Sequence, residues 1–403
     1  MKKIATTLLI IVTTCLFMIF YIANVVETEI KNAFNAPHHP DFSLQLLTYK
    51  RNFWSASASS KLTVNVDAQT RLIFNIDSAI SHLPYKATIT NVISLDNAQL
   101  ATSAKAYFGR DDWISSQESI DLFSQLTGKL VIAAGNHKSD SEYLSTKPVS
   151  IHYEMDLDSL RGNFQITWEG GEGHTNGIAI LLRSLQFDSS VGERSPSSEY
   201  DYNLIVEKIE FEQKKNHSLL ENILLRGVNQ RNNEQKTIDT INELRIGSYR
   251  WNKDKHHTFT NNNLKLAVNG LYQPAFEILN TGSNDSGEVE TALIELVFHG
   301  AQLTLSQLNS QTPWGEVDGD LDLTLEQGAA LVDILTNPYI LFDYISGDAR
   351  LVLPVSLLQE PLLTEPLQIG VMAGFLEQNE QTLNLETSFH QGELIVNGRV
   401  IPL

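Results

Sequence analysis

The sequence has almost no cysteine, since Cys15 is the only one among 403 residues. Cys15 lies inside an uncharged N-terminal run, so the chain has no thiol after it. This absence excludes disulfides, thiol catalysis and thiolate metal sites from the remainder of the chain. The stretch "VTTC" is superficially similar to a lipobox, but Thr14 stands where a small Gly or Ala is needed. The pattern therefore favours a cysteine within a helix.

The common local signatures of catalysis are also missing, including H-E-x-x-H, paired C-x-x-C, the Walker A loop and G-x-S-x-G. The glycine-rich stretch 170–177 lacks dinucleotide-binding spacing and predicts a hairpin loop. The aspartates of 318–325 alternate with leucines, as expected for the wet face of a strand and not for a calcium loop. The histidine pairs at 38–39 and 256–257 point apart on an extended chain. We therefore expect no metal site, no cofactor and no catalytic residue.

Basic residues are few compared with acidic ones: 29 stand against 48, for a formal net charge of −19. Without Lys2 and Lys3 the balance is −21. A domain of that charge repels nucleic acid, so nucleic-acid binding is not expected. The composition is 42% hydrophobic, which indicates a folded chain with a sizeable core.

The longest uncharged run, Ile4–Val26, predicts a membrane anchor. As a helix it extends about 34 Å, enough for a hydrocarbon core of about 30 Å. A signal peptide is the alternative, but its apolar region has only about 7–15 residues and ends at a small-x-small cleavage site. Because this run is longer and "YIANVVETEI" has no clear site, we expect an uncleaved signal anchor over residues 1–26. Lys2 and Lys3 precede the run, which predicts a cytoplasmic N-terminus and an exported body.

Alternation of apolar and polar residues dominates residues 27–403, as in "KLTVNVDAQ" and "DGDLDLTLEQ". Such alternation is typical of antiparallel strands with one solvated face. The predicted fold class is mainly β (α+β): an N-terminal transmembrane helix followed by an elongated antiparallel β-rich domain with a few helices. Loops at 188–201 and 280–290 are rich in Ser, Gly and Asp, and either could divide the domain into two lobes.

Four segments are helix candidates. The segment 25–35 continues the anchor, 114–126 has apolar residues at helical spacing, and 328–344 is the clearest case, with Pro338 as a kink. A weaker amphipathic candidate covers 217–225.

The stretch "TYKRNFWSASASSKLTVNV" places two aromatics beside a serine tract. It predicts a strand, a tight turn near Arg51–Asn52 and a returning strand. In this interpretation Phe53 or Trp54 fills the core edge of the hairpin, which is a structural role and not a binding one.

The same stretch resembles the YdgA-like family of Gram-negative bacteria, whose function is uncharacterised. That family carries, after its anchor, a motif similar to Y-x-R-G-x-F-S-S, on which Tyr49, Arg51, Trp54 and Ser55 fall. Asn52 replaces the family glycine, and Asn is the expected substitute if that position requires a positive φ.

Three further stretches support the resemblance: "SHLPY" (81–85), "ARLVLPVSLL" (349–358) and the terminal hairpin with its Asn397–Gly398 turn. The resemblance implies an inner-membrane anchor and a periplasmic β-rich domain. It implies no activity, cofactor or catalytic residue.

Two functional hypotheses follow. The favoured one is a non-enzymatic envelope scaffold, anchored through residues 4–26, that binds a lipid or an envelope protein. The alternative is a periplasmic hydrolase whose carboxylates meet near His152 or His174 only in the fold.

Overall fold

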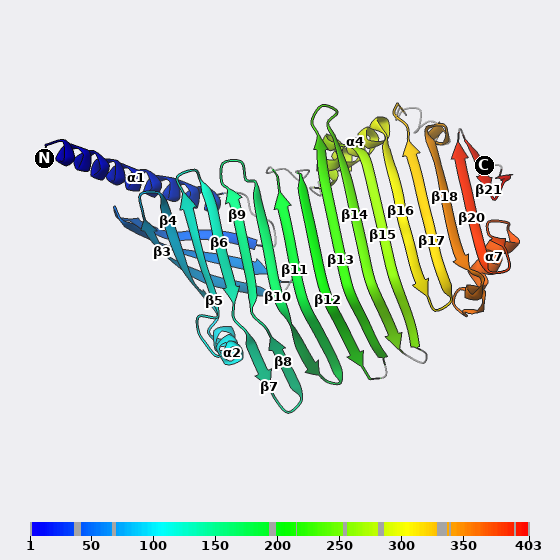
Figure 1. Cartoon of the computed structure of the whole chain (residues 1–403), viewed down its shortest axis with the longest axis horizontal. Helices are drawn as coiled ribbons and strands as arrows, with labels where there is room; N and C mark the ends of the chain where they lie inside the picture. The colour runs from blue at the N-terminus through cyan, green and yellow to red at the C-terminus, as the bar shows by residue number, and fades with distance from the viewer. Residues whose placement is uncertain are drawn as a thin grey trace. The chain divides into compact units, whose positions relative to one another are not determined.

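The computed structural model describes residues 2–35, 42–66, 70–192, 199–214, 216–252, 256–280, 286–328, 337, 340–390 and 392–401. Most of these residues are in β-strands, every strand pairing described among them is antiparallel, and helices are few (Figure 1). The predicted fold class, mainly β and antiparallel, is confirmed. The chain divides into two compact units: unit 1 has residues 1–176 and 183–190, and unit 2 has residues 177–182 and 191–403.

Unit 1 begins with a long helix and continues as a meander of strands. Its elements are α1 (Lys2–Asn35), β1 (Phe42–Arg51), β2 (Ser55–Asn65), β3 (Arg71–His82), β4 (Lys86–Leu95), α2 (Ala98–Phe108), β5 (Ile114–Asp121), β6 (Gln125–Ile132), β7 (Gly135–Lys138), β8 (Glu142–Thr146), β9 (Val149–Asp156) and β10 (Gly162–Thr175). β11 (Ile178–Val191) has residues in both units.

The strands of unit 1 pair mostly in chain order, from β1 through β6 and then to β9 and β10. β7 and β8 form a hairpin of their own, and β8 also pairs with β10. Pro148 separates β8 from β9, since proline has no N–H to give to a ladder.

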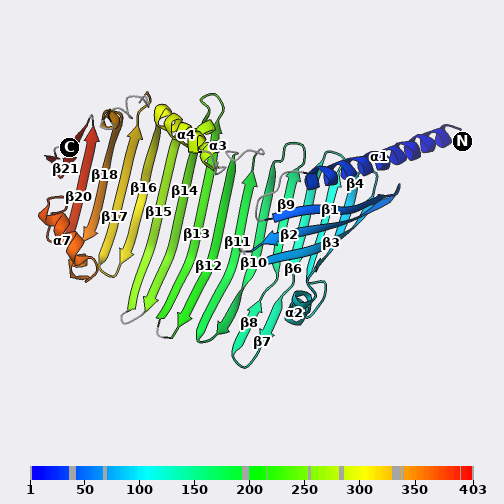
Figure 2. The same cartoon turned by 180° about the vertical axis from the view of Figure 1, so that it is seen from behind.

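Helix α1 contacts β1, β3 and β4, and Figure 2 shows it running above the hairpins of β1 to β3. The predicted continuation of the anchor helix through 25–35 is confirmed, since α1 ends at Asn35. Within α1, Thr13–Asn32 is long and apolar enough to cross a membrane, judged by length and composition.

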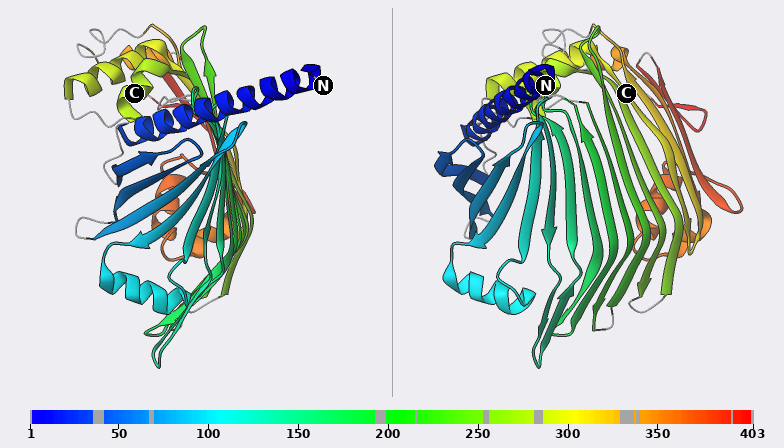
Figure 3. Two further views of the ribbon diagram at one scale, coloured as in Figure 1. Left: turned by 90° about the vertical axis from the view of Figure 1, so that its left-hand side faces the viewer. Right: turned by 60° about the vertical axis from the view of Figure 1, so that its left-hand side comes forward.

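Unit 2 is a second meander of long strands, β12 to β18 and then β20 to β22, with β19 also paired to β20. Figure 3 shows its strands as a curved layer. Its elements are β12 (Tyr200–Gln213), β13 (Asn216–Asn232), β14 (Thr237–Asn252), β15 (His256–Tyr272), α3 (Gln273–Asn280), α4 (Ser286–His299), β16 (Ala301–Thr312), β17 (Gly315–Leu325), α6 (Leu341–Tyr344), β18 (Ile345–Pro354), the 3-10 helix η2 (Val355–Gln359), α7 (Thr364–Met372), β19 (Glu377–Gln378), β20 (Thr382–His390), β21 (Glu393–Val396) and β22 (Arg399–Ile401).

Leucines from neighbouring strands of unit 2 stand opposite one another. One row runs in register through Leu204, Leu225, Leu244, Leu264 and Leu308. Because side chains alternate across a strand, this row belongs to one face of the sheet. We call it the leucine face.

Two predicted helices are wrong. The segment 114–126 forms β5, a turn and β6, and 217–225 lies within β13. In both cases the segment has strand partners on both sides, and that pairing outweighs an apolar spacing that fits either structure. Most of the candidate 328–344 lies outside the described residues. The described part includes the single turn α6.

Candidate functional site

The motif residues Tyr49, Arg51 and Trp54 lie where α1 packs against the β-sheet of unit 1. The turn 52–54 joins β1 to β2, and the turn 83–85 joins β3 to β4. These turns are neighbours, because Ser55 of β2 pairs with Ser81 of β3. We call this contact region of α1 with the two turns the anchor junction.

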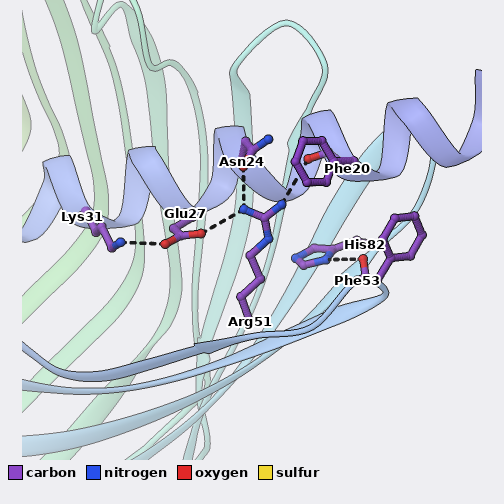
Figure 4. Close-up of polar contacts among 7 residues, drawn as sticks. All are labelled: Phe20, Asn24, Glu27, Lys31, Arg51, Phe53 and His82. Carbon is purple, nitrogen blue, oxygen red and sulfur yellow. Dashed lines mark hydrogen bonds and ion pairs between the residues drawn. The ribbon is translucent and has the colours of Figure 1, made fainter.

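Arg51 joins β1 to α1 at the anchor junction (Figure 4). One guanidinium nitrogen donates to Asn24 Oδ1 at 2.5 Å and to Glu27 Oε2 at 3.0 Å. The other donates to the carbonyl of Phe20 at 3.4 Å, and the group lies 5.1 Å from the centre of the Phe20 ring. Lys31 binds the second oxygen of Glu27 at 2.6 Å. A planar cation with several fixed donors suits three acceptors on one helix face.

A stripe of α1 is buried in the core of unit 1. Ile19, Ile22, Ala23 and Val26 are buried, at the i, i+3, i+4, i+7 spacing of one helix face. Ile22 and Val26 share a cluster with the following sheet residues: Ala56, Ile80, Ala87, Ile89 and Ile120. The last two turns of the uncharged N-terminal run are therefore core residues of a β-rich unit.

The serine tract after Trp54 has a packing explanation. In β2 the residues Ala56, Ala58 and Ser60 are buried, whereas Ser57 is exposed and Ser59 is half-buried. The alternation puts small residues on the inner face, where Ala56 joins the cluster that contains the α1 stripe. Small side chains let a helix approach a strand closely, so the tract makes room for α1.

His82 connects the two turns. Its side chain is buried, its Nδ1 lies 3.2 Å from the carbonyl oxygen of Phe53, and its backbone N–H donates to the carbonyl of Trp54 at 2.9 Å. Burial lowers the pKa of His82, the nearby Arg51 charge lowers it further, and the contact with Phe53 opposes both. The second ring nitrogen is buried and has no hydrogen-bond partner among the described residues. A neutral imidazole therefore holds the turns together.

Tyr49 lies next to the same core cluster. Burial, together with the charge of Glu27, raises the pKa of Tyr49 to about 12. Its hydroxyl is buried, and the described part of the chain offers it no hydrogen-bond partner. Tyr49 is therefore a packing residue that stays neutral at physiological pH.

The two aromatics of the turn do not fill the hairpin core, so that prediction is wrong. Phe53 is 40% exposed and Trp54 is 60% exposed, with their rings edge to face at 5.0 Å. The inner positions next to them are occupied by Ala56 and His82. Asn52 is not in the left-handed region either, so a positive φ does not explain the Asn at the position where the resembled motif has glycine.

The other candidate binding segments of the sequence, as far as they are described, have a structural role. The stretch 170–177 is the end of β10 and a turn at Asn176–Gly177, with φ of 48° and 77°. On β17, Asp318 and Asp320 pair with Arg350 on one face, as predicted for a solvated strand. The pair at 38–39 lies outside the described residues.

No described group of three or more His, Cys, Asp and Glu side chains is arranged to hold a metal ion. His152 and His174 are exposed, and His152 contacts Ser150 at 3.4 Å. Within the described part of the chain neither imidazole forms an ion pair with a carboxylate.

Aromatic rings gather at one end of β14 and β15 in unit 2. His257 stacks on Trp251 at 5.8 Å and on Trp314 at 5.3 Å between ring centres. Trp314 also lines an open depression of about 600 Å³ with Arg350 and Pro354. Trp251 and His257 are close in sequence, but Trp314 comes from the turn between β16 and β17, which local spacing does not predict.

Comparison with known proteins identifies the family. The model of a family described as "Bacterial protein of unknown function (DUF945)" matches residues 1–403. A search of curated proteins and a search of solved structures found no match. The chain therefore belongs to the DUF945 family.

Proposed function

We propose that this DUF945 member is a single-pass inner-membrane protein of the YdgA-like kind, and that its periplasmic body is a non-enzymatic envelope scaffold that binds a lipid or protein partner. Residues 1–26 are the uncleaved anchor and 27–403 the body, whose two lobes are divided near 188–201, where unit 2 continues from residue 191. The N-terminus with Lys2 and Lys3 is cytoplasmic, in accordance with the preference of Lys and Arg for that side.

The observation that carries this proposal is the burial of Ile19, Ile22, Ala23 and Val26 within unit 1. Signal peptidase removes a cleaved leader, and its residues cannot then serve as core residues of the mature protein. Here the apolar N-terminal helix and the β-sheet share one cluster. A helix that is needed to complete the core fits a retained anchor.

The leucine face supports a binding role. Leu264, on the fourth strand of its row, is 38% exposed, while Asp318, Asp320 and Arg350 form ion pairs on the other face of the sheet. Apolar surface that stays exposed on a sheet is a site at which a partner can bind. The described residues give no comparable support for catalysis.

The test of anchoring uses the full-length chain with Cys15→Ala and one new cysteine at Val66, an exposed residue of unit 1. We expect the chain to stay with membranes after alkaline extraction. We also expect the cysteine to react with a membrane-impermeant thiol reagent in cells whose outer membrane has been permeabilised. Release by alkali, or labelling only after the inner membrane is broken, would refute the proposed topology.

A further inference from the structure

We propose that the turns 52–54 and 83–85 insert into the headgroup region of the bilayer that α1 crosses, so that unit 1 is seated on the membrane and not suspended above it. The inference rests on the proposed membrane anchor and adds a second membrane contact, made by the sheet. Its occupant is the lipid of the surrounding bilayer.

The first argument is the length of helix available. The buried stripe of α1 begins at Ile19, and the uncharged run before it is Ile4–Met18. These 15 residues extend about 22 Å as a helix, whereas a hydrocarbon core is about 30 Å thick. The remaining depth, about 8 Å by difference, has to be covered by the turns of α1 that already pack against the sheet. Unit 1 must then approach the bilayer as far as the headgroups.

The second argument is the position of the turns along α1. Arg51 reaches Phe20 and Asn24, so the turn that follows Arg51 lies level with the first buried residues of the helix. Figure 4 shows Lys31, Glu27, Asn24 and Phe20 in that order along α1, with Phe53 on the Phe20 side. The turns therefore face the N-terminal part of α1, which is the part that enters the membrane.

The third argument is the side chains that the turns expose. Phe53, Trp54, Leu83 and Tyr85 are exposed on the turns, and Phe20 is exposed beside them on α1. Aromatic residues are enriched at membrane interfaces, where an amphipathic ring fits the headgroup level. A cluster of exposed aromatic side chains is apolar surface of the kind that marks a contact with a membrane or a protein.

The fourth argument is local charge. Residues 46–62 and 78–94, which contain both turns, have no Asp or Glu, although the whole chain has a net charge of −19. Lys50 is exposed next to the first turn, and Lys86 lies 5.8 Å from the Tyr85 ring in the second. Basic groups beside aromatic ones complement the phosphates of lipid headgroups. The charge and aromatic content of these turns therefore favour lipid over a protein partner.

The experiment measures how deep each turn lies in a bilayer. The full-length chain with Cys15→Ala receives one cysteine at a time, at Asn52 or Tyr85 in the turns and at Val66 as the control. Val66 is 59% exposed and lies at the opposite end of β2 from the turn 52–54. The 11 residues of β2 extend about 36 Å, so a label at Val66 is far from the turns. Each cysteine carries an environment-sensitive fluorophore, in vesicles with a shallow quencher attached to lipid.

We expect blue-shifted emission and strong quenching at positions 52 and 85, and water-like, unquenched emission at Val66. Water-like emission at all three positions, in a chain that still floats with the vesicles, would overturn the inference and leave the anchor intact. A chain that does not float would instead refute the proposed anchor. Blue-shifted but unquenched labels at 52 and 85 would also overturn it, because protein and not lipid would then cover the turns.

The aromatic contribution is tested separately with Trp54→Ser combined with Tyr85→Ser. Both side chains are exposed, so the variant is expected to fold. The label at Asn52 should then lose much of its quenching, while the corresponding label at Val66 should not change. Unchanged quenching at Asn52 would contradict insertion through the aromatic side chains.

Discussion

Arg51 is the residue on which the anchor junction depends most. Its guanidinium bonds to Asn24, Glu27 and the Phe20 carbonyl on three successive turns of α1. The two oxygens of Glu27 are divided between Arg51 and Lys31. A lysine at position 51 would bring a single nitrogen and lose the fork geometry that serves several acceptors at once. Arg51 therefore fixes the rotation of α1 against the sheet and also neutralises the charge of Glu27.

Replacement of Arg51 by alanine should weaken the docking of α1. Because Glu27 and Asn24 would lose a partly buried charged donor, we expect the free energy of unfolding of the full-length chain to fall by about 1–3 kcal/mol. Urea unfolding in detergent micelles measures this. Arg71→Ala is the matched control, since Arg71 makes one exposed hydrogen bond to Asn65. Equal effects of the two substitutions would contradict a special role for Arg51.

His82 gives the anchor junction a predicted pH dependence. Burial lowers its pKa below the ordinary value of 6.5, so the unfolded chain takes up the proton first as pH falls. The contribution of His82 to stability is therefore complete above about pH 6.5 and decreases as pH falls toward its folded-state pKa. Urea midpoints at pH 7.5 and 5.5 should differ less in His82→Gln than in the natural chain. His152→Gln, which changes an exposed histidine, should leave the difference as it is.

At the scale of elements, α1 has two environments along its length. Thr13, Thr14, Leu16 and Phe17 are exposed, whereas Ile19, Ile22, Ala23 and Val26 are buried. Removal of residues 1–26 would take this stripe out of the core. A soluble version of the body therefore has to keep the helix from Ile19 onward.

The buried stripe of α1 predicts that two substitutions only five residues apart change the free energy of unfolding by very different amounts. Ile22 is fully buried and Phe17 is 68% exposed. Ile22→Ala should lower the free energy of unfolding by about 2–5 kcal/mol through the cavity that it creates. Phe17→Ala should have little effect on unfolding in detergent. Similar values for both would mean that α1 is not part of the core.

The sequence predicted the strands well because alternation is a local signal, as in Leu62–Asn65 of β2. The closing turn at Asn397–Gly398 was also predicted, and its φ angles are 46° and 73°. It missed α2, although Asn97 caps its start through the N–H groups of Gln99 and Leu100, and Gly109 ends it at a positive φ. Both caps are readable in the sequence.

The anchor junction was only half predictable. The motif residues Tyr49, Arg51 and Trp54 were identified by resemblance, but their partners are separated in sequence by tens of residues. Arg51 meets Glu27 across 24 positions, and Phe53 meets His82 across 29. No periodicity connects such residues, since the topology of β1 to β4 and the docking of α1 bring them together. The exposure of Phe53 and Trp54 follows from the same packing, because α1 and small strand residues already fill the interior.

For the whole molecule, strongly acidic charge and an apolar face occur in the same chain. The net charge of −19 favours solubility and opposes non-specific association with anionic surfaces. Two regions depart from that average: the basic and aromatic turns of unit 1, and the leucine face of unit 2. Under the proposed function, the first region contacts the membrane and the second contacts a partner.

The leucine face can be tested with neighbouring residues of one strand. Leu264 and Lys265 are adjacent on β15 and point to opposite faces of the sheet. If the leucine face binds a lipid or protein partner, Leu264→Glu should abolish its retention, because a buried carboxylate opposes apolar contact. Lys265→Glu adds the same side chain on the other face and should leave retention unchanged. Native mass spectrometry of the full-length chain, released from mild detergent, measures bound lipid, and crosslinking in the intact envelope measures bound protein. Equal retention by the two variants would move the binding site away from the leucine face.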